Sequence, residues 1–150
     1  MRVHESGGMA QDDLEASVYA LADSFGLVLR RIRAVASSSN ELSLTENAVL
    51  VRLEREGPAT TAELARAHGM KPQSMGATVA SLADAGLIAR KPHPTDGRQV
   101  ILALTPKGLA LRKSTRAAKR TWLVEAVGRL GKEDQRRLFA ASAILRKLVE

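Results

Sequence analysis

The residues with the most informative chemistry lie between Thr60 and Gly108, in a segment that reads TTAELARAHGMKPQSMGATVASLADAGLIARKPHPTDGRQVILALTPKG. Gln73 and Ser74 carry hydrogen-bonding groups, and Ala77 offers a methyl group about one helical turn later. A glutamine amide can pair with adenine through two bonds, a serine hydroxyl can bond several bases, and a methyl group can pack on the methyl of thymine. These three side chains therefore suit the reading of base edges.

These side chains are expected on a helix over residues 72–85. Pro72 favours the first helical position, where its missing N–H would have no partner. The buried stripe of this helix is expected to be Met75, Val79 and Leu82. At about 100° per residue, Gln73 and Ala77 lie opposite that stripe, with Ser74 beside them. The alternative is the ordinary polar face of a surface helix.

Candidate phosphate contacts surround the start of this helix. Lys71 is a poor helix cap because its side chain has no acceptor oxygen. Its position favours a phosphate contact, and a solvated lysine is an equal alternative. The preceding short helix is expected to begin at Thr60, which has capping-box spacing to Glu63. Thr60 and Thr61 are further candidate phosphate contacts.

A β-hairpin is expected after this helix, over residues 88–104. Two β-prone runs are separated by a loop with an Asp-Gly pair, which is a turn signal. Arg98 lies just past the tip, where the negative potential of a narrow minor groove would attract it, and Arg90 and Lys91 add positive charge. We interpret Asp96 as structural, closing the turn and holding the guanidinium of Arg98. The alternative is a hairpin with a solvated arginine.

Helices are expected on both sides of this segment. Over residues 11–39, apolar residues recur at spacings of four and three, so this helix must bury its stripe against its own chain or a second copy. The stripe is Leu14, Val18, Leu21, Phe25, Val28, Ile32 and Val35. The run from residue 37 to 40 is expected to break the helix, and Thr45 to cap the next one. After the hairpin, Thr105 and Pro106 open a helix, and a last helix begins near Lys132. The sequence therefore predicts a mainly α fold with a small β-hairpin (α+β).

Charge is distributed unevenly along the 150 residues. The formal net charge of +7 favours a polyanionic partner, although it does not separate nucleic acid from an anionic membrane. Between Asp84 and Glu125 the only acidic residue is Asp96. The same span holds Arg90, Lys91, Arg98, Lys107, Arg112, Lys113, Arg116, Lys119 and Arg120. A solvated helix face usually mixes signs, so this asymmetry indicates an electrostatic footprint. For the last five of these residues, solvation or weak steering is favoured over direct phosphate or effector contacts.

Several other functions lack the residues they would need. The chain has no cysteine, which fits a cytosolic protein, and His4, His68 and His93 lack metal-ligand spacing. No catalytic arrangement stands out, so we expect neither an enzyme nor a cofactor. No segment approaches the roughly 20 apolar residues of a membrane span. Residues 1–10 are expected to form a disordered leader.

Taken together, these motifs resemble the MarR family of winged helix-turn-helix regulators, over nearly the whole chain. The matching motifs are Leu44-Thr45, Glu63-Leu64-Ala65, Leu82 with Gly86-Leu87, Arg90, Asp96-Gly97-Arg98 and Leu104-Thr105-Pro106-Lys107-Gly108. The resemblance implies a DNA-binding region over residues 42–108 and an obligate homodimer formed by residues 11–39 and 109–150. It implies binding to a pseudo-palindromic site in double-stranded DNA, often as a repressor released by a small ligand. In this family the position of Arg98 enters the minor groove, and that of Asp96 supports the wing.

One departure from the family pattern matters. Many relatives carry arginine at the position of Ala77, so Lys71, Gln73 and Ser74 must bear more of the base reading. A small amphipathic effector is a family-level expectation, and no residues are assigned to it. Two other hypotheses are a winged-helix assembly module that meets an acidic protein, and a regulator that senses no ligand.

Overall fold

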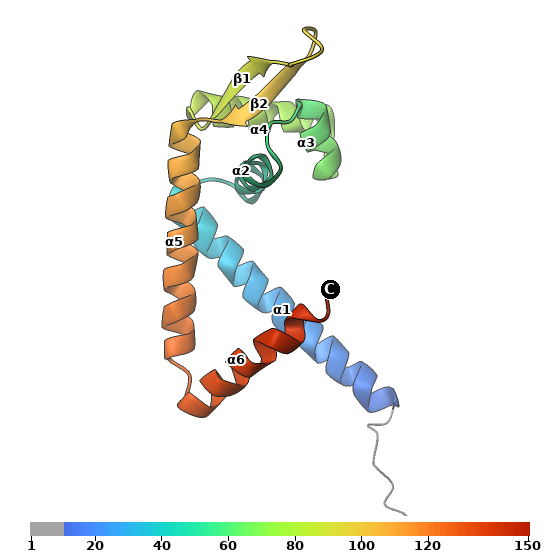
Figure 1. The fold of residues 1–150 in the computed structure, drawn as a ribbon, viewed down its shortest axis with the longest axis vertical. Helices are drawn as coiled ribbons and strands as arrows, with labels where there is room; N and C mark the ends of the chain where they lie inside the picture. The colour runs from blue at the N-terminus through green and yellow to red at the C-terminus, as the bar shows by residue number, and fades with distance from the viewer. Residues whose placement is uncertain (1–10) are drawn as a thin grey trace, which may run out of the picture. The chain divides into compact units, whose positions relative to one another are not determined.

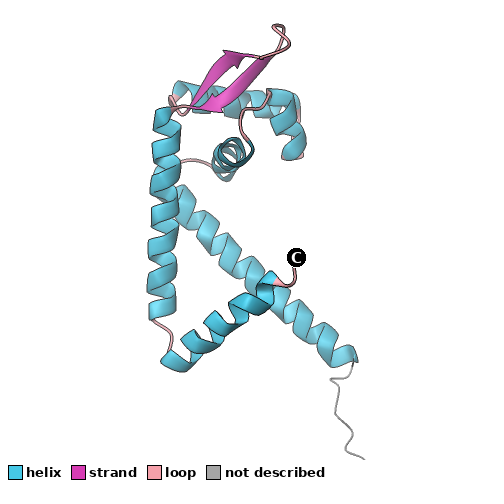
Figure 2. Cartoon of the chain, viewed as in Figure 1, coloured by secondary structure: helices cyan, strands magenta, loops and turns pink. Residues whose placement is uncertain are grey.

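The computed structural model describes residues 11–150 and divides into two compact units, one up to Ala34 and one from Val35 to Glu150. The expected leader, residues 1–10, lies outside the described residues. Figures 1 and 2 show helices along the described chain and β-structure in a single hairpin. The elements are α1 (Gln11–Asn40), α2 (Leu44–Glu56), α3 (Thr61–Ala67), α4 (Pro72–Asp84), β1 (Ile88–Pro92), β2 (Val100–Leu104), α5 (Pro106–Gly128) and α6 (Lys132–Arg146). The expected mainly α fold with one small hairpin is confirmed.

The serine run near the end of α1 does not break the helix, contrary to the sequence-based expectation. Ser38 and Ser39 donate their hydroxyl protons to carbonyl oxygens three residues earlier, at 3.1 and 2.8 Å. Serines that bond back to the preceding turn are compatible with a continuing helix. The helix ends only at Asn40, and Glu41 follows with a left-handed φ of 58°.

A pair of amides secures the bend between α1 and α2. Asn40 Nδ2 donates to Asn47 Oδ1 at 2.7 Å, and Asn47 Nδ2 donates to Asn40 Oδ1 at 3.2 Å. Asn40 Nδ2 also donates to Thr115 Oγ1 on α5, at 3.0 Å. Buried polar groups need hydrogen-bond partners. The three side chains supply them for one another and thereby connect three helices.

The expected cap of α2 at Thr45 is wrong, because Ser43 is the N-cap. Ser43 Oγ accepts from the main-chain N–H of Glu46 at 3.1 Å, and Glu46 Oε2 accepts from that of Ser43 at 2.8 Å. Such a capping box needs a glutamate three residues after the cap. Ser43 has Glu46 at that distance, whereas Thr45 has Ala48.

The hydrophobic core of the second unit is built by α2, α3, α4 and the hairpin. The expected stripe of α4 is confirmed, since Met75, Val79 and Leu82 are at most 1% exposed. They share one cluster with Leu50 of α2 and Leu64 of α3. Burying each large side chain contributes about 1.5–3 kcal/mol, so this cluster sets how the exposed face of α4 is presented.

The hairpin is anchored along both edges of β2. On one edge β1 pairs antiparallel to β2, with Ile88 opposite Leu104 and Pro92 opposite Val100. On the other edge, Leu102 N–H donates to the Ala59 carbonyl at 2.8 Å, and Ala59 N–H donates to that of Leu102 at 3.1 Å. The hairpin is therefore attached to the segment that joins α2 and α3. We call β1, β2 and the loop between them the wing.

The first turn of α5 also caps the end of α4. The Thr105 hydroxyl accepts from the Gly108 N–H at 3.0 Å and donates to the Gly86 carbonyl at 2.6 Å. Lys107 Nζ donates to the Ala85 carbonyl at 2.8 Å. Carbonyl groups at a helix C-terminus lack partners within the helix. The Leu-Thr-Pro-Lys-Gly motif follows β2, and it bonds the carbonyl groups that lie between α4 and β1. It therefore holds the end of β2 close to the start of β1 and to the end of α4.

The basic cluster on α5 is not simply solvated, contrary to the favoured expectation. The side chain of Arg112 is 6% exposed and its Nε donates to Glu54 Oε2 at 2.9 Å, while Arg116 pairs with the other oxygen of Glu54. Burial by itself would raise the pKa of Glu54, but the hydrogen bonds from Arg116 and Arg112 outweigh it and lower that pKa. Lys113 and Arg120 remain exposed. Part of the cluster thus ties α5 to α2.

Candidate nucleic-acid interface

The outer face of α4 carries polar groups with no partner in the part of the chain that the structure describes. Lys71, Gln73, Ser74 and Ala77 are all exposed. Gln73 and Ala77 lie opposite the buried stripe, Ser74 lies beside them, and Lys71 is the N-cap of the helix. Within residues 11–150, the Gln73 amide and the Ser74 hydroxyl make no intramolecular hydrogen bond, and Lys71 makes no side-chain cap bond. A Cβ at Gly76 would meet no neighbour within 4 Å, so the packing does not demand glycine there. This face is open to an external partner.

A contact that the sequence analysis did not identify holds α4 against the start of α2. Ser81 Oγ donates to Glu46 Oε1 at 2.6 Å, while the other oxygen of Glu46 caps α2 at Ser43. The hydrogen bond from Ser81 lowers the pKa of Glu46, and the main-chain N–H of Ser43 adds to the effect. The two side chains are 35 residues apart in sequence, so no local pattern signals the contact.

Acidification is expected to destabilise the fold through these glutamates. The pKa values of Glu46, Glu54 and Glu63 lie below the ordinary value of 4.5, so the unfolded chain binds protons more tightly than the folded one. Their stabilisation is present above the unfolded pKa of 4.5 and is lost as pH falls through the lower folded pKa values. The urea midpoint should therefore fall steadily as the pH is lowered below 4.5. A Glu46→Gln variant should show a shallower drop, and a slope equal to that of the wild type would contradict this assignment.

Asp96 organises the wing loop through main-chain and amide groups. Its Oδ1 accepts from the main-chain N–H of Arg98 at 3.1 Å, and its Oδ2 accepts from Gln99 Nε2 at 3.2 Å. The expectation that Asp96 closes the turn agrees with this geometry. The expectation that it holds the guanidinium of Arg98 is wrong, because within residues 11–150 the Arg98 side chain does not pair with Asp96. The Arg98 side chain is exposed and makes no ion pair within residues 11–150.

The other two cations of the wing do not share one face. Arg90 lies opposite Leu102 and Lys91 lies opposite Ile101 in the strand register. Successive side chains of a strand point to opposite faces of the sheet. Arg90 and Lys91 are both exposed, but they point to opposite faces of the hairpin. A partner bound to one face can therefore contact only one of them. Arg98, at the loop, is free of this restriction.

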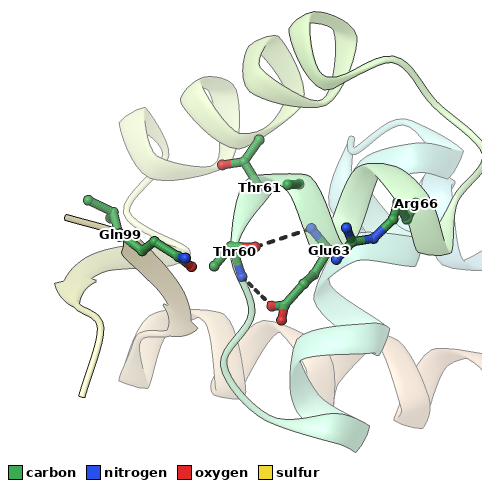
Figure 3. Close-up of a pocket in the computed structure, with 7 residues that line it drawn as sticks. Thr60, Thr61, Glu63, Arg66 and Gln99 are labelled. Carbon is green, nitrogen blue, oxygen red and sulfur yellow. Dashed lines mark hydrogen bonds between the residues drawn. The ribbon is translucent and has the colours of Figure 1, made fainter. Parts of the chain in front are cut away.

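An open groove lies between the start of α3 and the end of β2 that adjoins the wing loop (Figure 3). It is lined by Thr60, Thr61, Ala62, Glu63, Arg66, Gln99 and Val100. The capping box expected for α3 is confirmed: Thr60 N–H donates to Glu63 Oε2 at 2.8 Å, and Thr60 Oγ1 accepts from Glu63 N–H at 3.2 Å. The main-chain N–H of Thr60 lowers the pKa of Glu63, which therefore stays anionic at neutral pH.

This capping box changes the order of the candidate phosphate contacts. The groups of Thr60 are engaged with a carboxylate, and a carboxylate repels phosphate. Thr61 makes no side-chain hydrogen bond within the described chain, and Arg66 presents an exposed cation on the same groove. Arg66 lies in the last turn of α3, away from the cap that drew attention to the threonines, so the local sequence pattern did not single it out.

The described residues offer little for other chemistry. Between residues 11 and 150, no group of three or more His, Cys, Asp or Glu side chains is placed to hold a metal ion. Over the same stretch, no helix has both the length and the apolar character needed to cross a bilayer.

Two helices joined by a tight turn and followed by a paired hairpin define the winged helix-turn-helix class of proteins. The sequence profile described as the MarR family matches residues 42–100. The HTH-type transcriptional regulator Mb0904 of Mycobacterium bovis is 34% identical over 133 residues, which cover 87% of this chain and 93% of that protein. The HTH-type transcriptional repressor Rv2887 of Mycobacterium tuberculosis is 34% identical over 129 residues, covering 86% and 91%. The chain belongs to the MarR family, and it is a DNA-binding transcriptional regulator rather than an enzyme.

Solved structures share the whole fold. The crystal structure of RV1404 from Mycobacterium tuberculosis has a TM-score of 0.73 and 25% identity, covering 94% of this chain and 97% of that one. A mutant of S. aureus MepR, bound to an oligodeoxyribonucleotide, has a TM-score of 0.66 and 15% identity, covering 89% and 98%. At the latter identity the likeness concerns the fold alone.

Proposed function

We propose that this regulator is a ligand-responsive repressor that binds a pseudo-palindromic operator as a homodimer. Each subunit places α4 in the major groove and the wing in the adjacent minor groove. One observation carries the proposal: the exposed, unpartnered Gln73 and Ser74 on α4 are followed by a wing whose Arg98 is exposed and unpaired. These are the groups that read base edges and that a narrow minor groove attracts. The name of the repressor Rv2887 supports repression, and the oligonucleotide on MepR supports this use of the fold.

The groove beside α3 supplies phosphate contacts in this proposal. Thr61 and Arg66 line this groove, and Lys71 lies at the start of α4. In the proposed complex, all three would contact phosphates of the DNA strand that borders the major groove. Contacts to phosphate position a protein on the duplex without reading its sequence. Two-fold symmetry then puts the half-sites about one helical turn apart, near ~10 bp between their centres.

Fluorescence anisotropy with duplexes from upstream of the protein's own gene tests the proposal. A scrambled duplex is the control, and both are titrated across a salt series. Sequence-preferring binding that weakens steeply with salt supports a specific regulator. Equal binding to both duplexes contradicts it and indicates a nonspecific DNA coat. Absence of binding at low salt would instead favour a winged-helix assembly module with an acidic protein partner.

Two substitutions should separate positioning from base reading. Arg98→Ala is expected to weaken binding to specific and scrambled duplexes alike, because attraction into a narrow groove needs no base-specific bond. Gln73→Ala is expected to reduce mainly the discrimination between the two duplexes, by about 1–3 kcal/mol. Dissociation constants on both duplexes give the comparison. Equal effects of the two changes on specific and scrambled DNA would contradict this division.

The dimer is supported by the apolar stripe on α1. Leu14, Val18, Leu21, Phe25 and Val28 are each between 37% and 53% exposed in the single chain. Exposed apolar surface of this extent marks an interface. Their spacing of four and three matches the seam of two packed helices, so a second copy of the chain is the natural cover. Leu138, Phe139, Ile144 and Leu148 leave further apolar surface at the C-terminal end.

A charge placed in the stripe should abolish the dimer. Leu21→Glu would bury a carboxylate without a partner between the copies, which is strongly unfavourable. Sedimentation velocity should then give the mass of one 16.1 kDa chain rather than two. Arg30→Glu, on the outer face of the same helix, is the matched control and should stay dimeric. A wild-type protein that sediments as a monomer would refute the dimer itself.

The ligand response is tested with a panel of small amphipathic acids. A ligand that binds only the folded state raises the melting temperature. An effector must also weaken binding to the operator duplex in the anisotropy assay. A panel that changes neither quantity would contradict this part of the proposal and favour a regulator that acts by abundance alone.

A further inference from the structure

We propose that His93 is the positioning residue of the wing, and that its Nδ1 atom accepts the main-chain amides of Thr95 and Asp96 and so sets where Arg98 leaves the loop. The inference rests on the proposed function, in which Arg98 enters a minor groove.

Three donors converge on one ring nitrogen of His93. The main-chain N–H groups of Thr95 and Asp96 lie 3.2 and 3.1 Å from Nδ1, and the Thr95 hydroxyl oxygen lies 3.3 Å from it. A main-chain N–H can only donate. Nδ1 must therefore be the unprotonated nitrogen, and Nε2 carries the ring proton.

The two prolines around His93 explain why these donors meet it. Pro92 ends β1, and Pro94 restricts His93 to an extended conformation. Pro94 has no N–H, so the next amides along the chain are those of Thr95 and Asp96. In an Asx-turn, the side-chain oxygen of Asn or Asp accepts a main-chain N–H two residues further along the chain. Nδ1 of His93 acts as the acceptor here in the same way.

The loop relays this constraint to Arg98. His93 fixes the main chain at Asp96, and the carboxylate of Asp96 then accepts from the main-chain N–H of Arg98 at 3.1 Å. The ends of the loop are closed separately. The N–H of His93 donates to the Gln99 carbonyl at 3.1 Å, and the N–H of Gln99 donates to the Asp96 carbonyl at 3.0 Å. His93 is therefore the first of two side chains that order the segment from which Arg98 projects.

Asparagine and glutamine make a matched pair of replacements. In His93→Asn the amide oxygen occupies nearly the place of Nδ1 and can accept the same two amides. In His93→Gln the same amide is one methylene further from the main chain and meets the donors poorly. Both variants lack the imidazole ring, so a difference between them reports the acceptor rather than the ring.

The first measurement uses the full-length protein without DNA. Long-range proton–nitrogen correlation spectra of the imidazole rings distinguish the two neutral tautomers, and the chain has only three histidines. We expect the His93 resonance to show a proton on Nε2 and a lone pair on Nδ1. A proton on Nδ1 would overturn the proposal, whether or not the protein binds DNA.

The second measurement is anisotropy on the preferred duplex, with each variant made in the wild-type and Arg98→Ala backgrounds. His93→Gln is expected to weaken binding about tenfold, the size of a lost hydrogen-bonded constraint, and His93→Asn to remain within about threefold of the wild type. In the Arg98→Ala background, His93→Gln should add less than about twofold, because residues that act through one another are not additive. Equal affinity of the Asn and Gln variants, or the full tenfold loss without Arg98, would overturn the proposal.

These outcomes separate the new inference from the proposed function. Suppose that the ring is in the expected tautomer but the wild-type protein prefers no duplex. The operator model has then failed, and the hydrogen bonds of His93 stabilise the wing without positioning Arg98 for DNA. If the wild type binds specifically and His93→Gln lowers only the melting temperature, the operator model stands and the positioning role is lost.

Discussion

Replacing Gly108 by alanine is expected to lower the free energy of unfolding by about 3 kcal/mol or more, the upper range of overpacking effects. A Cβ at this position would overlap the main-chain carbonyl oxygen of Leu87 and would lie 3.2 Å from Leu104 Cδ2. The obstacle is main chain, so no side-chain rotation can relieve it. The change would separate the first turn of α5 from the start of β1. Urea unfolding at a fixed protein concentration measures the effect.

Gly128→Ala is the matched control for this substitution. It lies at the other end of the same helix, and a Cβ there meets nothing within 4 Å. Both changes reduce the entropy of the unfolded chain equally, so their difference isolates the contact in the folded state. The control should be neutral or stabilising by up to about 1 kcal/mol. Equal midpoints for the two variants would show that Gly108 does not require the close approach.

Replacing Glu54 by alanine is expected to cost about 3–5 kcal/mol, because it leaves a buried charge without its partner. The side chain of Arg112 is 6% exposed and Glu54 supplies its only hydrogen-bonded acceptor within the described chain. Once Glu54 is removed, the guanidinium must stay buried unpaired or pull α5 away from α2. The urea midpoint, with the slope checked for a change in the exposed area, gives the measurement.

Two further variants identify the origin of this loss. In Glu54→Leu combined with Arg112→Met, both charges disappear, and the double variant should recover most of the lost stability. Arg116 is the other partner of Glu54, and the side chain of Arg116 is 48% exposed. Arg116→Ala should therefore cost no more than about 1 kcal/mol. A double variant as unstable as Glu54→Ala would show that packing, rather than the unpaired charge, is responsible.

Local signals identified most of the elements correctly, and the errors have local explanations. Thr60 with Glu63, and Pro72 after Lys71, specify helix starts within four residues, and both starts are confirmed. The same capping rule applied to Ser43 and Glu46 would have identified the start of α2, which was instead assigned to Thr45. The end of α1 was placed too early because serine hydroxyls can also bond back into a helix.

The sequence by itself determined the order of the helices, the hairpin and the exposed polar face of α4, since caps, turn residues and apolar periodicity act over a few neighbouring positions. Only the tertiary structure decided which charged groups are internal. Arg112 and Glu54 are 58 residues apart, and Ser81 and Glu46 are 35 apart, so their pairing depends on how the helices pack. The same holds for the groove beside α3, which is lined by Arg66 of one helix and by Gln99 of the wing. Along the chain, a basic residue on a helix looks the same whether it is solvated or buried, because burial is a property of the packed elements around it.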